Sequence, residues 1–542
     1  MNKATFCGLL LAALVAGLAL RFSRLDIRPM HHDEANQAVK FGTLLETGEY
    51  RYDRNDHHGP TLYYLTLPAA WIRGQTTLAE LDEWTLRAVP AAMGVGLILL
   101  FGLLAGGLGR EAVAAAACFA ALSPALTYYS RFYIQESLFA FLALGFLLAL
   151  GRYALRPRTG WAVAAGICAG LAYATKETSI IVFASAGTAL VLSLIASKGI
   201  PLHRYAREGS WVAAHPLLGR RYRGMADVLI GLAAALFVAG VFYSSFFRNP
   251  GGILESVRAF KEYAVRGTEA GLHAHPWSFY LEILGFSAAG GLIWTEGMIL
   301  LLALAGAVFA IPGIGRRNGM LDPAASISSA RVAEYFWARY LFLYSLFAAA
   351  IFSVIRYKTP WNLLPFYIGF VLAAGIGAAA LLRSLRSGWA RSLLLLALIA
   401  GACHLGIQNW RANYRYPADP RNPYVYAQTS PDFLRLSKRV HDLAAVHPDG
   451  KSMLVKVIAG PYEQWPLPWH LRDLRRVGYW TGPDAAGGFA GVPVVIATEE
   501  NAGKLAAALG DHFQAEFYGL RPGVLLTIYI DRTLWDRLLN TR

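Results

Sequence analysis

The sequence predicts a polytopic α-helical membrane protein that ends in a small soluble α/β domain. Of its 542 residues, 56% are hydrophobic and only 16% are charged, a balance unlike that of soluble globular proteins. Apolar runs close to the length that crosses a bilayer as a helix recur up to about residue 410. Beyond that point the pattern changes to short runs typical of strands and amphipathic helices.

Residues 1–410 are predicted to form a transmembrane domain of about eleven helices, each recognised by its length and hydropathy. The expected spans are residues 5–22, 86–108, 111–129, 136–152, 161–175, 178–197, 226–247, 286–311, 337–355, 363–382 and 391–409. A long first loop, residues 23–85, contains an apolar and aromatic stretch at residues 60–72. That stretch is too short to span, so we expect a helix lying along the membrane surface.

The distribution of lysine and arginine predicts the orientation. The net charge is +15, and the basic residues gather in short loops that alternate along the chain. This bias places the N-terminus in the cytoplasm and the C-terminal domain outside the inner (plasma) membrane, and it explains the charge without nucleic-acid binding. The first span is expected to be retained as an anchor, because the residues around Arg21 and Arg24 offer no small-residue cleavage site.

The remainder of the chain is divided into a linker, residues 411–424, and a soluble extracytoplasmic domain, residues 425–542. Strands are predicted near residues 452–459 and 492–498, each followed by a helical segment, residues 461–475 and 500–509. A closing pair of strands is expected at residues 513–518 and 524–530. The four cysteines all lie in apolar runs, so no disulfide framework is indicated.

Ionisable residues that are far apart in sequence fall on one predicted side of the membrane. They are Asp33, Glu34, Glu136, Lys176 and Lys358. Each alone has an ordinary interpretation, as a solvated loop acid, an acid at a helix N-terminus or a lysine reaching the headgroups. Ionisable groups at membrane depth are costly and mark substrate pathways or active sites, so their shared face favours a catalytic site.

The first loop also contains pairs of histidines. The further candidates for the site or for a metal are His31, His32, His57, His58 and Arg131. Histidine is the usual ligand or proton carrier near neutral pH. Two adjacent histidines do not easily chelate one ion, so no cofactor is assigned and a divalent metal is left open. The neighbouring carboxylates of Asp33 and Glu34 repel each other, which favours different pKa values and different roles.

Several of these motifs resemble those of the GT-C glycosyltransferases, including the protein O-mannosyltransferases and the lipid A aminoarabinose transferase. They are Asp33-Glu34, His58-Gly59-Pro60 before the aromatic stretch, the Arg131–Ser137 segment, Thr175-Lys176-Glu177 and Tyr357-Lys358-Thr359-Pro360-Trp361. With Trp465-Pro466-Leu467-Pro468-Trp469 in its tail, the chain is similar to the flippase-activity-associated proteins of N-glycosylation clusters.

The resemblance implies a GT-C-like fold and inverting transfer of a sugar from a polyprenyl-phosphate donor to a glycan, lipid or protein acceptor. By the same resemblance Asp33 is the general base with Glu34 beside it, and Glu136 is the second acid. Lys176 and Lys358 hold the donor phosphate, and Arg356 adds a bidentate contact. This chemistry is sound, since a phosphate leaving group needs fixed positive charge and an acceptor hydroxyl needs a base.

Two other functions remain open from the sequence. A flippase for lipid-linked oligosaccharide, or an accessory subunit of one, would also need basic groups for a pyrophosphate. A flippase is expected to carry charged residues near the bilayer midplane, whereas the ionisable residues here lie at predicted helix ends. A scaffold that displays the soluble tail would not need the clustered acids and lysines. The pattern therefore favours an enzyme.

Overall fold

The computed structural model describes residues 1–55, 58–196, 217–268, 273–310 and 329–541. The chain falls into two compact units. The helical unit comprises Met1–Ser23, Glu49–Leu65 and Arg87–Arg415, and the sheet unit comprises Arg24–Gly48, Thr66–Leu86 and Tyr416–Arg542. Two helices, α3 (Thr61–Ile72) and α4 (Glu83–Gly102), begin in one unit and end in the other.

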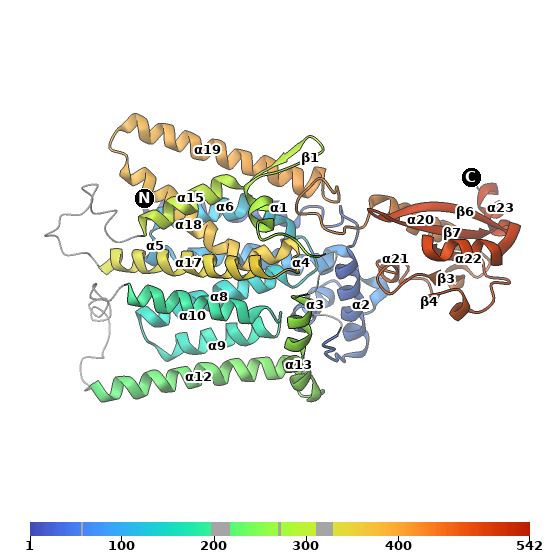
Figure 1. Ribbon diagram of the computed structural model, residues 1–542, viewed down its shortest axis with the longest axis horizontal. Helices are drawn as coiled ribbons and strands as arrows, with labels where there is room; N and C mark the ends of the chain where they lie inside the picture. Colours follow the sequence, from blue (N-terminus) through green and yellow to red (C-terminus); the bar gives the residue numbers. More distant parts are fainter. Residues whose placement is uncertain (56–57, 197–216, 269–272, 311–328, 542) are drawn as a thin grey trace. The chain divides into compact units, whose positions relative to one another are not determined.

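The helical unit is a bundle of long apolar helices (Figure 1). Besides α3 and α4 its described elements are α1 (Lys3–Phe22), α5 (Ala105–Leu108), α6 (Arg110–Leu122), α7 (Pro124–Ser130), α8 (Glu136–Leu155), α9 (Thr159–Tyr173), α10 (Ser179–Ile195), α12 (Leu217–Tyr243), α13 (Gly251–Arg266), α14 (Phe279–Gly285), β1 (Ser287–Ala289), β2 (Leu292–Trp294), α15 (Gly297–Phe309), α17 (Ser329–Val354), η2 (Pro360–Leu363), α18 (Leu364–Ser384), α19 (Gly388–Trp410) and η3 (Arg411–Arg415).

The helices confirm a polytopic membrane protein. Among the described residues seven helices are long and apolar enough to cross a membrane, or eight if the bent pair α6 and α7 forms one span. Three shorter apolar helices, α9, α10 and α15, coincide with three more of the expected spans. The predicted span at residues 286–311 is wrong over residues 286–296, because a β-hairpin of β1 and β2 precedes a helix that begins only at Gly297.

Helix α18 lies at the centre of the bundle. It is the most buried of the apolar helices and packs against α15, α6, α17 and α8. Small residues permit this packing, because a Cβ added at Gly306 or Gly377 would come within 2.2 Å or 2.0 Å of a carbonyl oxygen on the facing helix. Close backbone approach at glycine is the usual way for helices to associate in lipid, where no hydrophobic force drives them together.

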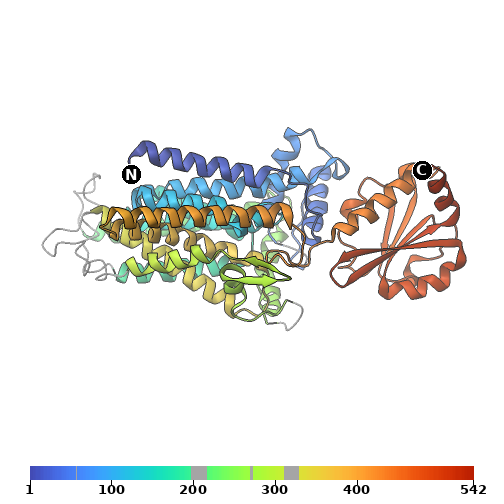
Figure 2. The same cartoon turned by 90° about the horizontal axis from the view of Figure 1, so that it is seen from above.

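The sheet unit contains a five-stranded mixed sheet (Figure 2). Its strands β3 (Leu454–Ile458), β4 (Arg476–Trp480), β5 (Val494–Thr498), β6 (Phe513–Arg521) and β7 (Val524–Asp531) follow the order β4-β3-β5-β7-β6. Strand β3 is parallel to β4 and β5, and β7 is antiparallel to β5 and β6. The helical elements of this unit are α2 (His32–Thr47), η1 (Leu78–Glu80), α20 (Pro431–Val446), η4 (Gly450–Ser452), α21 (Leu467–His470), η5 (Asp484–Ala486), α22 (Glu499–Leu509), η6 (Gly510–His512) and α23 (Arg532–Asn540).

Successive strand residues build two cores. Val494 and Ile496 of β5 pack with α20 and α23 on one face, and Val495 and Ala497 pack with α22 on the other. This alternation follows from the two-residue period of a strand. Because both faces are covered, the inner strands are mostly apolar, and the predicted strands at residues 452–459, 492–498, 513–518 and 524–530 are each found.

Two predictions from the sequence differ from the structure in this unit. The helix expected at residues 461–475 is wrong, because only Leu467–His470 is α-helical and the strand β4 follows at Arg476. Pro466 and Pro468 restrict the backbone there and remove two amide donors. The first loop, expected as part of the transmembrane domain, is divided, since Arg24–Gly48 and Thr66–Leu86 group with the C-terminal residues.

Candidate active site

A buried ion pair stands at the start of α8. Glu136, the first residue of that helix, is 1% exposed, and its Oε1 lies 2.5 Å from the Nζ of Lys176. Lys176, 3% exposed, comes from the turn between α9 and α10 and also donates to Oδ1 of Asn362, 2.8 Å away in η2. Three motifs separated by up to 226 positions in sequence therefore meet at one point of the helical unit.

The ion pair leaves one polar atom without a partner. Within the described part of the chain, Oε2 of Glu136 is buried and has no hydrogen-bond partner. An unsatisfied buried carboxylate oxygen is costly, so such atoms call for a ligand, an ion or a water. The ammonium of Lys176 donates to two described acceptors and has three N–H groups, so it retains one for a ligand. The cluster can therefore receive a hydroxyl and an anionic oxygen side by side.

The first-loop motif packs on the lysine motif. Gly59 donates its amide to the carbonyl of Thr175 at 3.1 Å, and the hydroxyl groups of Thr61 and Thr175 are 2.7 Å apart. A Cβ at Gly59 would lie 2.0 Å from the carbonyl oxygen of Ala174, so only glycine fits there. His58-Gly59-Pro60-Thr61 and Thr175-Lys176-Glu177 are thus two halves of one contact.

Glu177 anchors the same contact. Its side chain is buried and accepts from the hydroxyl of Tyr52 at 3.0 Å, and its other oxygen lies 2.8 Å from Nδ1 of His58. The ring of Tyr263 stacks on His58. Burial raises the pKa of the Glu177 carboxyl, but the charge and hydrogen bond of His58 and further hydrogen bonds outweigh it, and the net shift of this pKa is downward.

Lys358 is also buried, at 1% exposed, but its contacts differ from those of Lys176. Its Nζ donates to the carbonyl oxygens of His275 at 2.9 Å and Ile355 at 2.5 Å. Its backbone amide donates to His273, where residues 274 and 357 form an antiparallel bridge. Burial lowers the pKa of the Lys358 ammonium. The neighbouring Arg356 is exposed.

Arg131 closes the end of α1. Its guanidinium donates to the carbonyl oxygens of Leu20, Arg21 and Ser23, at 2.7–3.2 Å, and lies over the ring of Tyr414. A cation at the C-terminus of a helix satisfies its last carbonyls and its dipole. A guanidinium has no lone pair to offer a metal. These contacts give Arg131 a structural role, and its role in the site stays a prediction.

In the sheet unit, Asp33 and Glu34 lie in the first turn of α2. His31 is the N-cap, and its Nδ1 accepts from the backbone amide of Asp33 at 3.0 Å. The Oε2 of the fully buried Glu34 accepts from the amide of His31 at 3.1 Å, which completes a capping box, and Arg28 lies 4.0 Å from Glu34. Asp33 keeps a 31% exposed side chain.

His31 is neutral in this arrangement. Its Nε2 lies 3.0 Å from the carbonyl oxygen of Tyr426, so Nε2 carries the proton, while Nδ1 accepts from Asp33 and carries none. Burial lowers the pKa of His31, in agreement with this tautomer. The ring of His32 donates from Nδ1 to the carbonyl oxygen of Tyr462 at 3.1 Å and stacks on that tyrosine. The histidines thus act here through hydrogen bonds and stacking.

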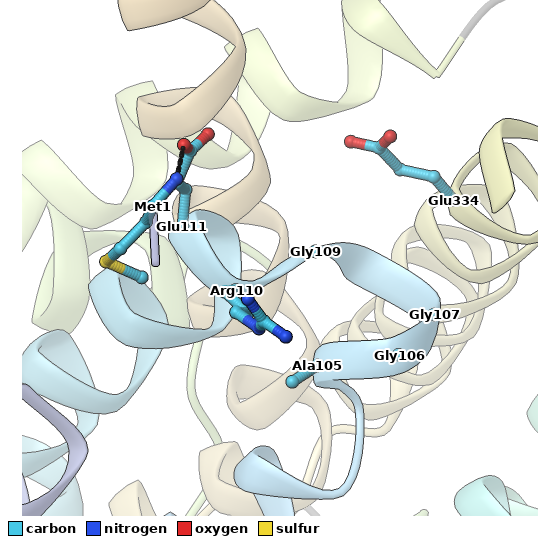
Figure 3. A pocket seen from close by; sticks show the side chains of 8 residues that line it. All are labelled: Met1, Ala105, Gly106, Gly107, Gly109, Arg110, Glu111 and Glu334. Atoms are coloured by element: carbon cyan, nitrogen blue, oxygen red, sulfur yellow. Dashed lines mark hydrogen bonds and ion pairs between the residues drawn. The ribbon is translucent and has the colours of Figure 1, made fainter. Parts of the chain in front are cut away.

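The metal expectation finds no donor set in the described residues, where no three His, Cys, Asp or Glu side chains come together as metal ligands would. His57 lies outside the described residues. A cavity of about 380 Å³ lies at the opposite end of α1 from Arg131, and it is lined by Met1, Ala105, Gly106, Gly107, Gly109, Arg110, Glu111 and Glu334 (Figure 3). It contains none of the predicted site residues, and the amine of Met1 pairs there with Glu111 at 2.8 Å.

The sequence did not single out three polar residues whose side chains hydrogen-bond inside the helical unit: Asn362, Glu177 and Glu296. Asn362 is uncharged and directly follows the motif Tyr357–Trp361, so nothing in the sequence marked it as a site residue. Glu177 was noted only as a partner of Lys176. Glu296, fully buried, accepts from Ser123, from the amide of Ala125 and from Tyr367 at 2.5–2.9 Å. An acid just before the apolar run 297–309 was the available signal for it.

Comparisons with known proteins agree with this description. Residues 7–220 match the family model described as dolichyl-phosphate-mannose-protein mannosyltransferase. No curated protein sequence matches the chain. The structure is similar to ArnT from Cupriavidus metallidurans bound to undecaprenyl phosphate, with 15% identity, coverage of 97% of this chain and 98% of that chain, and a TM-score of 0.56.

It is also similar to the oligosaccharyltransferase of Archaeoglobus fulgidus in its apo form, with 14% identity, coverage of 96% of this chain and 74% of that chain, and a TM-score of 0.55. The archaeal oligosaccharyltransferase AglB from the same organism, in complex with an inhibitory peptide and a dolichol-phosphate, gives 14% identity, the same two coverages and a TM-score of 0.53. Identities this low establish the fold, which is the GT-C fold that the sequence motifs implied. The match over residues 7–220 and the shared fold make the chain similar to membrane glycosyltransferases of the GT-C fold.

Proposed function

We propose that the protein transfers a sugar from a polyprenyl-phosphate donor to an acceptor on the extracytoplasmic face of the inner membrane, with inversion at the anomeric carbon. Two structures of the same fold are complexes with undecaprenyl phosphate and with dolichol-phosphate, which supports a polyprenyl carrier here. In the N-in orientation expected from the basic loops, the start of α8 and the α9–α10 turn lie on the outer side.

The observation that carries the proposal is the buried cluster of Glu136, Lys176 and Asn362. A lysine at 3% exposure is expensive to bury at membrane depth. Structure alone gives little reason to keep it, since apolar residues of similar volume often replace a buried ion pair without loss of stability. The one N–H group that Lys176 retains suits an oxygen of a lipid carrier's phosphate, and the unpartnered oxygen of Glu136 suits a donor such as a sugar hydroxyl. Lys358, the second buried lysine, is assigned to the same phosphate and retains one N–H group of its own.

The reaction is a single displacement. The carboxylate of Asp33 takes the proton of the acceptor hydroxyl as its oxygen attacks the anomeric carbon. The bond from that carbon to the phosphate oxygen breaks on the opposite face, and the polyprenyl phosphate leaves with the bonding electron pair. The lysine ammonium groups stabilise the negative charge that grows on the leaving oxygen. Glu34, held in the capping box, fixes the first turn of α2 and with it the direction of Asp33.

Purified protein in lipid nanodiscs, supplied with radiolabelled polyprenyl-phosphate sugars and a lipid extract as acceptor, tests this function. Wild-type protein should form a labelled product, and Asp33→Asn, which keeps the size of the side chain, should lower turnover by roughly 10²–10⁴-fold. Asp511→Asn, a change at an exposed aspartate of the sheet unit, is the matched control and should leave turnover unchanged. Full activity in Asp33→Asn would remove this residue from the mechanism.

The alternative, a flippase or accessory subunit for lipid-linked oligosaccharide, gives a different result in the same nanodiscs and in sealed vesicles. It would show no labelled product with any donor, and it would move a labelled lipid-linked oligosaccharide between leaflets. That pair of results would overturn the proposed transferase.

A further inference from the structure

The tail motif Trp465-Pro466-Leu467-Pro468-Trp469 divides into a half that is explained by packing and a half, led by the partly exposed Trp465, that follows the exposed Tyr462. Trp469 is completely buried, and its indole donates to Oε1 of Glu83 at 2.9 Å. The guanidinium of Arg472 lies 3.7 Å from the Trp469 ring and donates to the carbonyl oxygen of Leu81. This half joins two segments of the sheet unit and is explained by packing alone.

The other half presents aromatic rings at the start of α2. Tyr462 is 69% exposed although its ring stacks on His32, with centroids 6.1 Å apart and planes at 25°. The ring of Trp465 also contacts the imidazole of His32, with ring centroids 6.1 Å apart. A tyrosine that served packing would be covered, as Trp469 is. A ring held in place by stacking, with its outer face exposed, is available to a ligand.

A charged pair flanks the rings. Nη2 of Arg521, at the end of β6, lies 3.6 Å from Oε1 of Glu463, and both side chains are partly exposed. Burial lowers the pKa of Arg521, and the charges of Glu463 and Asp33 act against this shift. Arg521 is therefore within electrostatic range of the carboxylate proposed as the base. An aromatic ring, a donor fork and a carboxylate acceptor thus lie together, and the ring stacks on His32, the residue before Asp33.

This combination suits a sugar ring better than a peptide. The apolar face of a pyranose can lie on Tyr462 while its hydroxyl groups bond to Arg521 and Glu463, since charge-assisted hydrogen bonds give direction and strength. A peptide bound as an extended strand would need unpaired backbone groups. The amides of Glu463 and Gln464 are already donated to the carbonyl of Gly460 within a tight turn.

We infer that Tyr462, Glu463 and Arg521 form the acceptor subsite of this protein and bind the terminal sugar of a glycan acceptor next to Asp33. The inference rests on the proposed transferase function for the fate of that sugar, but the binding itself does not. It assigns to the C-terminal residues the choice of acceptor, while Lys176 and Lys358 deal with the donor.

Binding is tested on the full-length protein in nanodiscs by saturation-transfer NMR, with a panel of soluble disaccharides and trisaccharides and with serine- and threonine-containing octapeptides. Wild-type protein should bind at least one of the saccharides, and Tyr462→Ala should raise its dissociation constant about 3- to 10-fold. Glu463→Gln provides a second variant with little risk to folding, because the side chain is on the surface. Phe517→Ala is the matched control, because Phe517 is 70% exposed on β6, and it should leave binding unchanged.

Kinetics separates this inference from the transferase itself. In the transfer assay Tyr462→Ala should raise the KM for the acceptor about 3- to 10-fold and leave the KM for the donor and the acceptor-independent hydrolysis of the donor unchanged. Wild-type protein that binds saccharide but transfers nothing would leave the subsite standing and remove the transferase. Saccharide binding equal in wild type and Tyr462→Ala, preferential binding of the peptides, or no binding of any saccharide would overturn the subsite.

Discussion

Two lysines that look alike in sequence have unlike surroundings in the structure. Lys176 pairs with a carboxylate and an amide, each supplied by a distant element, α8 and η2. Lys358 donates to two backbone carbonyls, one of them three residues away in its own turn. Both are buried to 3% or less, so burial by itself does not distinguish a group held for chemistry from one that fastens a loop.

The two lysines differ in which acceptors would lose their partner if the ammonium group were removed. Without the Lys176 ammonium, the buried carboxylate of Glu136 has no counter-charge, which is costly. Without the Lys358 ammonium, two neutral carbonyl groups lose a hydrogen-bond donor, which costs less. If both lysines also hold the donor phosphate, their effects on activity will resemble each other more closely than their effects on stability. The following variants test that contrast, from the largest expected effect to the smallest.

Lys176→Met should destabilise the protein by about 3–5 kcal/mol, because a buried carboxylate loses its cation. SDS-induced unfolding in mixed micelles would measure this, with the exposed Lys504→Met as the matched control. The double variant Lys176→Met/Glu136→Gln should recover most of the stability, since no unpaired charge remains, yet stay inactive. A double variant that regains activity would show that Lys176 serves folding alone.

Lys358→Met should cost about 1.5–3 kcal/mol, the range for hydrogen bonds made by a charged group. Turnover should fall, and the KM for the polyprenyl-phosphate donor should rise, because the same charge contacts substrate and leaving group. The assay is steady-state transfer with the donor concentration varied. A variant with the stability loss but an unchanged donor KM would make Lys358 a structural clip between residues 275 and 355.

Acid pH should loosen the turn that carries Lys176. The pKa of Glu177 is lowered in the folded protein, so its ionised form stabilises the fold. That contribution is complete above the ordinary carboxyl value of 4.5 and is lost as the pH falls through the lower folded-state pKa. Unfolding midpoints measured from pH 7 downward should therefore fall more steeply for wild type than for Glu177→Gln. Parallel profiles would contradict this role of Glu177.

Thr61→Val should have the smallest effect, about 0.5–1.5 kcal/mol, because it removes one neutral hydrogen bond to Thr175. Thr175 still donates to the carbonyl of Leu171 at 2.7 Å, so its hydroxyl keeps a partner. Thermal unfolding monitored by intrinsic fluorescence would detect the change. A loss above 3 kcal/mol would mean that the contact between residues 58–61 and 174–177 supports more of the bundle than this bond.

Sequence alone predicted the fold class and its elements well, because hydropathy and strand alternation are local. It also brought Glu136 and Lys176 to the same side, and the structure joins them. It missed that Glu34 belongs to a capping box, because His31 rather than serine or threonine is the cap. A metal was left open because histidines recur in the first loop, whereas the contacts of His31, His32 and His58 come from residues 119–430 positions away.

The contacts of the tail residues within the sheet unit could not be predicted from the sequence either. Nothing local in Trp465–Trp469 indicates that one tryptophan would be buried against Glu83 and the other would meet His32. Such contacts depend on the whole topology, and the first loop and the tail come together only in three dimensions. Arg131 shows the same limit, since it was a candidate as part of the segment Arg131–Ser137, and the carbonyls that it contacts lie 108–111 positions away.

The 58° bend between α6 and α7 is held by the side chain of Glu296, which accepts from Ser123 and from the amide of Ala125 at the start of α7. Straightening the pair would strip a buried carboxylate of its donors. Contacts within the protein therefore hold the angle. Because α7 leads directly to Arg131 and Glu136, the entrance to α8 should survive extraction into detergent, so that preparations stripped of lipid remain suitable for measuring the chemistry.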